Sequence, residues 1–137
     1  MSDIMKFPDL GATLSKQIVG AAIEVHKHLG PGLLESIYEQ CLEIELKRLG
    51  VGFERQKKIP VIYKGQAIGE GFRADFIVEN KIIIELKAVE KIIPLHEAQL
   101  LSYMKLSKIP LGLIMNFNAV LLKDGIKRMA LSQNVTD

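Results

Sequence analysis

A short apolar run in the middle of the chain, residues 82–88, has the pattern of a core strand but carries two charges, Glu85 and Lys87. Side chains alternate between the faces of a strand, so these two project to the same side, about 7 Å apart. Burying charges costs several kcal/mol unless they are paired, hydrogen-bonded or bound to a metal. Ten residues before Glu85, Asp75 opens a second apolar run, Phe76-Ile77-Val78. An acid followed by Glu-x-Lys on the next strand predicts a site for a divalent cation and a polarised water.

This metal-site hypothesis constrains how the two strands pair. For Asp75 to share a face with Glu85, the two residues must lie opposite each other in an antiparallel hairpin. That pairing puts Val78 opposite Ile82 and leaves three residues in the loop, among them Asn80, which tolerates the left-handed conformation that such loops need. A two-residue loop would turn Asp75 to the opposite face. We therefore expect an odd-length loop or a bulge here.

Length and composition indicate an ordinary globular chain. Its 137 residues, 48% hydrophobic and 25% charged, predict one domain covering residues 1–137. The net charge of +2 is too small to argue for a nucleic-acid partner by itself. Cys41 is the one cysteine and sits at an apolar helical position, as expected for a buried thiol in a reducing compartment. Without a signal-like core at the start or an apolar stretch of ~20 residues, we expect a cytoplasmic protein that does not enter a membrane.

Hydrophobic periodicity predicts the elements around the site. Helices are expected at about residues 12–28, 33–49 and 95–106, the first two separated by Gly30-Pro31-Gly32 and the third starting after Pro94. Strands are expected at about residues 59–63, 66–72, 74–78, 82–88, 111–117, 120–122 and 126–130, with a turn at Lys64-Gly65 and a C-terminal hairpin. This order predicts an α/β fold: a mixed central sheet flanked by helices, two of them N-terminal, with the third helix as a crossover.

The residue pattern alone also allows purely structural explanations for the candidate site residues. Asp75, Glu85 and Lys87 could form a salt bridge on a solvent-facing edge strand. Gln99 and Tyr103 share a face of the third helix, which can look back toward the carboxylates or simply mark the boundary between core and surface. A carboxylate in the first turn of a helix is favourable through the helix dipole alone, which would suffice to explain Glu35. The basic residues Lys123, Lys127 and Arg128 are candidate phosphate contacts or solvated surface.

The segment Gly32-Leu33-Leu34-Glu35-Ser36-Ile37-Tyr38 resembles the motif that names the GxxExxY protein family. The likeness extends from about residue 18 to residue 128. It includes Arg73-Ala74-Asp75, Glu85-Leu86-Lys87, His96-Glu97-Ala98-Gln99-Leu100 and Leu122-Lys123-Asp124-Gly125-Ile126-Lys127-Arg128. That family is regarded as a compact member of the PD-(D/E)XK nuclease superfamily. The resemblance therefore implies a restriction-endonuclease-like core, although Ala74 stands where the superfamily's name has proline.

The resemblance also implies roles for individual residues. Asp75 and Glu85 would be metal ligands for Mg²⁺ or Mn²⁺, and Lys87 the catalytic lysine. Glu35 would be the helix-borne acid that many superfamily members place near the metal. Gln99 with Tyr103 resembles the Gln-x-x-x-Tyr element of RecB-like nucleases.

Three functional hypotheses follow. The leading one is a divalent-metal-dependent hydrolase of phosphodiester bonds in nucleic acid, with DNA favoured. The second is a non-catalytic nucleic-acid-binding or assembly module that keeps the nuclease fold. The third is a subunit of a larger complex, or a homodimer, because association would enlarge the small surface of such a chain.

Overall fold

The computed structural model describes residues 2–132 of the chain and the side chains of residues 13–132. Its helices are α1 (Ser2–Leu29), α2 (Glu35–Leu49), α3 (Pro94–Ser107) and a short 3-10 helix, η1 (Leu122–Gly125). Its strands are β1 (Phe53–Ile59), β2 (Ile62–Tyr63), β3 (Gln66–Ala67), β4 (Phe72–Val78), β5 (Ile82–Lys87), β6 (Leu111–Asn116) and β7 (Ile126–Ala130). Within this part of the chain, no helix combines the length and apolar character that crossing a membrane requires.

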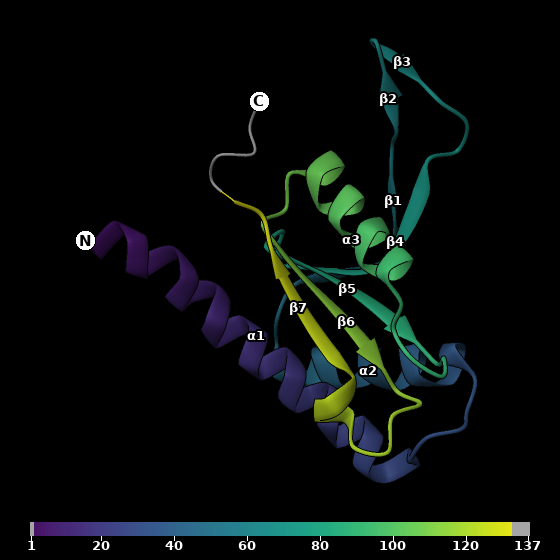
Figure 1. Cartoon of the computed structure of the whole chain (residues 1–137). Coiled ribbons are helices and arrows are strands. Elements are labelled where there is room, and N and C mark those ends of the chain that lie inside the picture. The colour runs from purple at the N-terminus through teal and green to yellow at the C-terminus, as the bar shows by residue number, and fades with distance from the viewer. Residues whose placement is uncertain (1, 133–137) are drawn as a thin grey trace.

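Five strands form one mixed sheet in the order β1-β4-β5-β6-β7 (Figure 1). Neighbouring strands are antiparallel except β5 and β6, which are parallel. Parallel neighbours need a crossover connection, and α3 supplies it, as the sequence predicts. The remaining strands, β2 and β3, pair with each other in a separate hairpin. The predicted α/β class with a mixed central sheet flanked by helices is confirmed.

The two faces of the sheet pack against different helices. Leu86 of β5 belongs to a buried cluster that includes side chains of α1 and α2. Ile83, on the other face, belongs to a second buried cluster with side chains of α3. Because side chains alternate along the strand, Glu85 and Lys87 lie on the α3 face with Ile83. The charged face of β5 is therefore the one that the crossover helix partly covers.

The predicted register of the β4–β5 hairpin is confirmed. Val78 pairs with Ile82, which leaves the three residues 79–81 as the loop. Asn80 adopts the expected left-handed conformation with φ of 54°, and Glu79 does so as well. A loop of this length keeps Asp75 and Glu85 at the same level of the two strands.

Two strand boundaries differ from the sequence prediction. The first strand begins at Phe53 rather than near residue 59, because its charged side chains find partners: Arg55 bonds to carboxylates on α2. The turn at Lys64-Gly65 is confirmed, with positive φ at both residues. However, β3 ends at Ala67, and the next strand starts only at Phe72.

The expected strand at residues 120–122 is wrong. Leu122 instead begins the 3-10 helix and is buried against the core that α1 and α2 share. At the end of this helix, a Cβ on Gly125 would lie 2.6 Å from the carbonyl oxygen of Asn116, so only glycine allows such a close approach. Consequently β7 pairs with the buried strand β6 rather than with residues 120–122, and covers its open edge.

We predict that Gly112→Val destabilises the protein by about 1–3 kcal/mol, because it overpacks the contact between β6 and α3. A Cβ at Gly112 would lie 2.7 Å from Met104 Sδ and 2.9 Å from Leu100 Cδ2, both buried. Chemical denaturation measures the change. Gly20→Ala is the matched control, since a Cβ there meets nothing within 4 Å in a helix interior and should be neutral or stabilising. Equal stability of the Gly112 variant and wild type would contradict this packing.

Candidate active site

Two carboxylates replace the backbone ladder between β4 and β5. Ladder pairing ends at Phe76 and Ile84, one position before Asp75 and Glu85. At that position the backbone N–H of Asp75 donates to Glu85 Oε2 at 2.9 Å. The backbone N–H of Leu86 donates to Asp75 Oδ2 at 2.8 Å. Each acid thus accepts a hydrogen bond from the strand of the other, which fixes both carboxylates at one place in the sheet.

Burial makes both acids harder to ionise. It raises the pKa of Glu85 to about 8, and the negative charge of Asp75 adds to the rise. Burial also raises the pKa of Asp75, against the opposing effect of the hydrogen bond from Leu86. Two half-buried acids side by side repel each other once both are ionised, and a cation bound between them removes that repulsion.

Lys87 lies beside this pair without neutralising it. Its positive charge lowers the pKa of Glu85, so the ammonium is within electrostatic reach. Within residues 13–132, no ion pair joins Lys87 to either carboxylate. Moreover, β5 is an interior strand between β4 and β6. The alternative of a salt bridge on a solvent-facing edge strand is therefore wrong.

The second helix brings two further acids to the site, of which the sequence predicted one. Glu35 begins α2, and its Oε2 accepts a hydrogen bond of 3.3 Å from the backbone N–H of Ala88. Its negative charge helps to raise the pKa values of Asp75 and Glu85. Glu39, one turn further along α2, is buried and also raises the pKa of Asp75. Four acids from three elements therefore shape the electrostatics here.

Glu39 is held by a partner that the sequence reasoning missed, Arg55 of β1. The guanidinium Nε of Arg55 lies 2.6 Å from Glu39 Oε2, and its Nη1 lies 2.9 Å from Glu43 Oε1. Hydrogen bonds to both acids raise the pKa of Arg55, with that to Glu39 the stronger. Periodicity along the chain carries no signal for this contact, because it joins a helix to a strand across the fold.

Gln56 was missed as well, and it links the acids to each other. Its side-chain Nε2 donates to Asp75 Oδ1 at 3.1 Å and to Glu39 Oε1 and Oε2 at 3.1 and 3.0 Å. Its backbone has φ of 54°, which is uncommon for a residue other than glycine. Unusual backbone conformations of this kind gather at functional sites, where surrounding contacts hold them in place.

At the left-handed residue Gln56, the side chains of β1 and β4 switch from one side of the sheet to the other. Phe53 and Ile59 are six residues apart and should share a face, yet Phe53 packs on the α1–α2 cluster and Ile59 in the α3 cluster. On β4, Phe76 and Ala74 divide between the two clusters in the same way. The pairing register does not slip across this point. The strands therefore twist at Gln56 and Asp75, and their outer halves fold over toward α3.

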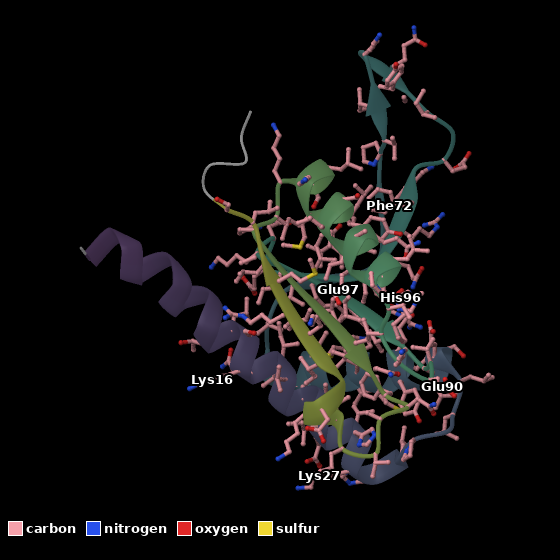
Figure 2. The ribbon with its side chains drawn as sticks, in the orientation of Figure 1. Lys16, Lys27, Phe72, Glu90, His96 and Glu97 are labelled. Atoms are coloured by element: carbon pink, nitrogen blue, oxygen red, sulfur yellow. The ribbon has the colours of Figure 1, made fainter. Side chains whose placement is uncertain are left out.

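The α3 helix places Tyr103 close to the acids and leaves Gln99 exposed. Tyr103 stacks on Phe72 of β4, with ring centroids 3.8 Å apart, and Phe72 lies beside α3 in Figure 2. Burial raises the pKa of the Tyr103 phenol, followed by the negative charges of Glu85 and Asp75. The phenol is thus within electrostatic reach of the carboxylate pair. Gln99 lies one turn earlier on α3 and is exposed to solvent.

The three predicted phosphate contacts do not form one surface. Lys127 of β7 pairs with Ile114 and Arg128 with Leu113, so the two side chains leave opposite faces of the sheet. Lys127 is on the α3 face, where its Nζ lies 3.8 Å from Glu97 Oε2. Lys123 is exposed in η1. Of the three, Lys127 therefore shares the face of Glu85 and Lys87.

Comparison with protein-family models gives a match to the PD-(D/E)XK nuclease superfamily over residues 12–129. The chain belongs to the PD-(D/E)XK nuclease superfamily. The match covers the strands that carry Asp75, Glu85 and Lys87, and the mixed sheet agrees with the restriction-endonuclease-like core of these nucleases. Membership of the GxxExxY family stays a prediction. Comparisons with curated proteins and with solved structures gave no match.

PD-(D/E)XK nucleases generally use divalent metal ions, and the acids here fit such an ion in part. No group of three or more acidic, histidine or cysteine side chains set to hold a metal occurs in the described part of the chain. Mg²⁺ needs fewer, since it commonly binds through one or two carboxylates plus water and phosphate oxygens. Glu85 Oε1 accepts no hydrogen bond from residues 13–132 and is not sealed from solvent, so a ligand oxygen is available.

We predict that the metal-free protein loses stability as pH rises from about 4.5 to 8. The pKa of Glu85 is about 8 in the folded chain, against an ordinary value of 4.5. The folded state therefore keeps a proton that the unfolded state releases. The stability that this proton contributes is complete below pH 4.5 and is lost as pH rises through 8, by at most about 1.4 kcal/mol per pH unit.

Denaturation in EDTA at several pH values, on wild type and Glu85→Gln, measures this effect. We expect the variant to show a flatter pH dependence and to be the more stable of the two at pH 8. Glu70→Gln is the control, because that side chain is 91% exposed and should leave the wild-type slope unchanged. If Glu85→Gln keeps the full slope, Glu85 is not the group that titrates.

Proposed function

We propose that this protein hydrolyses phosphodiester bonds in nucleic acid, with DNA as the favoured substrate, and depends on Mg²⁺ or Mn²⁺. The observation that carries the proposal is the carboxylate pair on β4 and β5. Asp75 and Glu85 stand where ladder hydrogen bonds would otherwise form, and burial raises both pKa values. Such an arrangement opposes folding of the metal-free chain and favours binding of a cation, which is the expected signature of a functional site.

In this proposal Asp75 and Glu85 hold the ion, and Glu35, whose charge raises the pKa values of both, would be a further ligand for it or for a second ion. When bound, the ion lowers the pKa of a bound water and offsets negative charge on the phosphate. Gln56 donates to Asp75 Oδ1, and Leu86 N–H to Oδ2, so the chain itself keeps the Asp75 carboxylate in one orientation. A fixed ligand is what a site needs to bind a small ion that demands regular geometry.

Lys87 is the proposed catalytic lysine. Its ammonium would donate hydrogen bonds to the attacking water or to a phosphate oxygen as charge develops there. The backbone around it is firmly held: Phe117 N–H donates to the carbonyl of Lys87 at 2.8 Å. The side chain of Asn116 then bonds both the N–H and the carbonyl of Val89, at 3.1 and 2.9 Å. Lys87 therefore projects from a rigid strand end.

Residues of α3 and β7 would bind the substrate. Tyr103 and Gln99 occupy one face of α3 and are proposed to position the substrate or the attacking water. Lys127 is the best placed of the predicted phosphate contacts, because it shares the face of Lys87. Lys123 and Arg128 would contact phosphates further along the strand only if the substrate passes around the β7 edge.

We predict that Lys87→Ala lowers the cleavage rate by about 100-fold or more, as expected when one donor to the developing charge is lost. Stability should change little, because the Lys87 side chain has no ion pair among the described residues. The assay uses plasmid, linear duplex and single-stranded DNA with Mg²⁺ or Mn²⁺. Lys16→Ala is the control, since Lys16 is exposed on α1, away from the site in Figure 2.

Two results would count against the proposal in different ways. Unchanged cleavage by Lys87→Ala would refute the role of Lys87. A folded wild type that cleaves none of these substrates with either metal would favour the alternative, a nucleic-acid-binding or assembly module that keeps the nuclease fold.

A further inference from the structure

The outer part of the β1–β4 ribbon extends away from the rest of the molecule. Residues 57–73, which we name the arm, comprise the end of β1, the β2–β3 hairpin and the start of β4. In Figure 1 the arm rises beyond the sheet next to α3, with the β2–β3 hairpin at its tip. Residues 62–70 are all exposed. An isolated two-stranded hairpin contributes little to stability in water, so the arm is not explained by packing of the core.

The positive charge of the chain is concentrated on this arm. It carries four cationic side chains and one acidic one, a net charge of +3. The whole chain has a net charge of +2, so the remainder is at −1. The cations are Lys57, Lys58, Lys64 and Arg73. Two of them pair with neighbouring acids, whereas Lys64 at the tip and Arg73 at the base have no acid partner within residues 13–132. This charge distribution is complementary to a polyanion.

The tip of the arm presents large apolar side chains to solvent. Ile62, Tyr63 and Ile68 are 52%, 62% and 48% exposed, and Lys64 Nζ lies 5.4 Å from the centre of the Tyr63 ring. Proteins that enter a DNA groove use a similar mixture: cations contact phosphates, and apolar or aromatic side chains contact base edges, thymine methyl groups or base steps. The arm therefore combines both kinds of contact on one narrow ribbon.

The base of the arm is fixed to the candidate active site. Phe72 stacks on Tyr103, which feels the charges of Glu85 and Asp75. Arg73 Nη1 donates to the carbonyl of Gln56 at 3.4 Å, and Gln56 in turn bonds Asp75. Gly71 lets the two strands approach closely, because a Cβ there would overlap the carbonyl oxygen of Ile59. The arm is thus held in a set direction relative to the carboxylates.

We propose that the arm lies in the major groove of double-stranded DNA whose backbone is bound at Asp75 and Glu85. This inference rests on the proposed function and names its substrate. The major groove of B-DNA admits a two-stranded ribbon, whereas the major groove of double-stranded RNA is too narrow to admit one. Asp75 lies eleven positions after Lys64, a reach of roughly 36 Å at most at about 3.3 Å per residue. That is about one helical turn of DNA.

The test compares the double variant Tyr63→Ala/Lys64→Ala with a matched control, Ile44→Ala/Lys47→Ala. The control removes an exposed apolar side chain and an exposed lysine from α2 instead. Fluorescence anisotropy measures binding to a duplex DNA of about 30 base pairs, to one of its strands and to the same duplex in RNA, with Ca²⁺ in place of Mg²⁺ so that a cation can bind between the carboxylates. The Kd of each protein is measured over a range of salt concentrations, and circular dichroism verifies folding.

We expect wild type to bind duplex DNA at least about tenfold more tightly than the single strand or the RNA duplex. The arm variant should lose about tenfold in duplex affinity, and its salt slope should fall by about 1 for the lost phosphate contact. The control should stay within about twofold. Duplexes shorter than about ten base pairs, one helical turn, should bind both proteins equally.

Three results would overturn the inference. One is equal duplex affinity of wild type and arm variant. Another is a wild type that binds no DNA, or binds single strands or RNA duplexes as tightly as the DNA duplex. The third is sedimentation that shows a wild-type dimer dissociated by the arm variant with DNA binding intact, since a second copy of the chain would then occupy the arm. Duplex binding through the arm without any cleavage would refute the proposed hydrolysis and leave the arm proposal standing, whereas cleavage with equal duplex affinity of wild type and arm variant would refute the arm proposal alone.

Discussion

The central constraint in this structure is the exchange of hydrogen bonds between two strands and two carboxylates. Asp75 and Glu85 each accept a backbone N–H from the strand of the other, so the acids take the place of the β-ladder. A ladder of apolar residues would be more stable, because buried acids pay a desolvation penalty. The chain keeps the acids and spreads their support over β1, β4, β5 and α2. Burying the two acids lowers the free energy of unfolding of the metal-free protein. A cation that binds between them removes their repulsion and restores that stability.

The supporting contacts explain why elements far apart in sequence converge here. Gln56 bonds both Asp75 and Glu39, and Arg55 holds Glu39 against α2. On the other side, Asn116 of β6 fixes the chain that leaves β5. His26 of α1 has its Nε2 within 3.1 Å of the Phe117 carbonyl and 2.9 Å of that of Ala119, and so steadies the loop after β6. These bonds tie the segments that flank the site to other elements of the fold and so hold it in place.

The parts of the site that depend on local pattern can be predicted from the amino-acid sequence. Alternation placed Glu85 and Lys87 on one face, and the three-residue loop gave the register that brings Asp75 beside Glu85. The predicted catalytic, metal and phosphate roles stay predictions. What sequence reasoning missed are contacts between distant elements and one backbone conformation. Glutamine does not indicate a left-handed backbone, so the positive φ of Gln56 could not be predicted from its residue type. The Arg55–Glu39 pair joins a strand to a helix, and no local pattern predicts such a contact.

The failure at residues 120–122 has a related cause. Their run of three apolar residues suits a strand, but β7 pairs with the open edge of β6, and burial of Leu122 favours a 3-10 turn. Tertiary contacts overrode local preference there. The twist at Gln56 likewise could not be predicted from periodicity, yet it directs the arm toward α3 and so determines which surface lies next to the carboxylates.

The most direct test of the account is calorimetric titration of Mn²⁺ into wild type, Asp75→Asn and Glu85→Gln. It needs no knowledge of the substrate. We expect wild type to bind the ion, with release of protons near neutral pH because the pKa of Glu85 is raised to about 8, and both variants to lose binding. Binding of equal affinity in all three proteins would contradict the central claim, because the ion would then lie elsewhere than between β4 and β5.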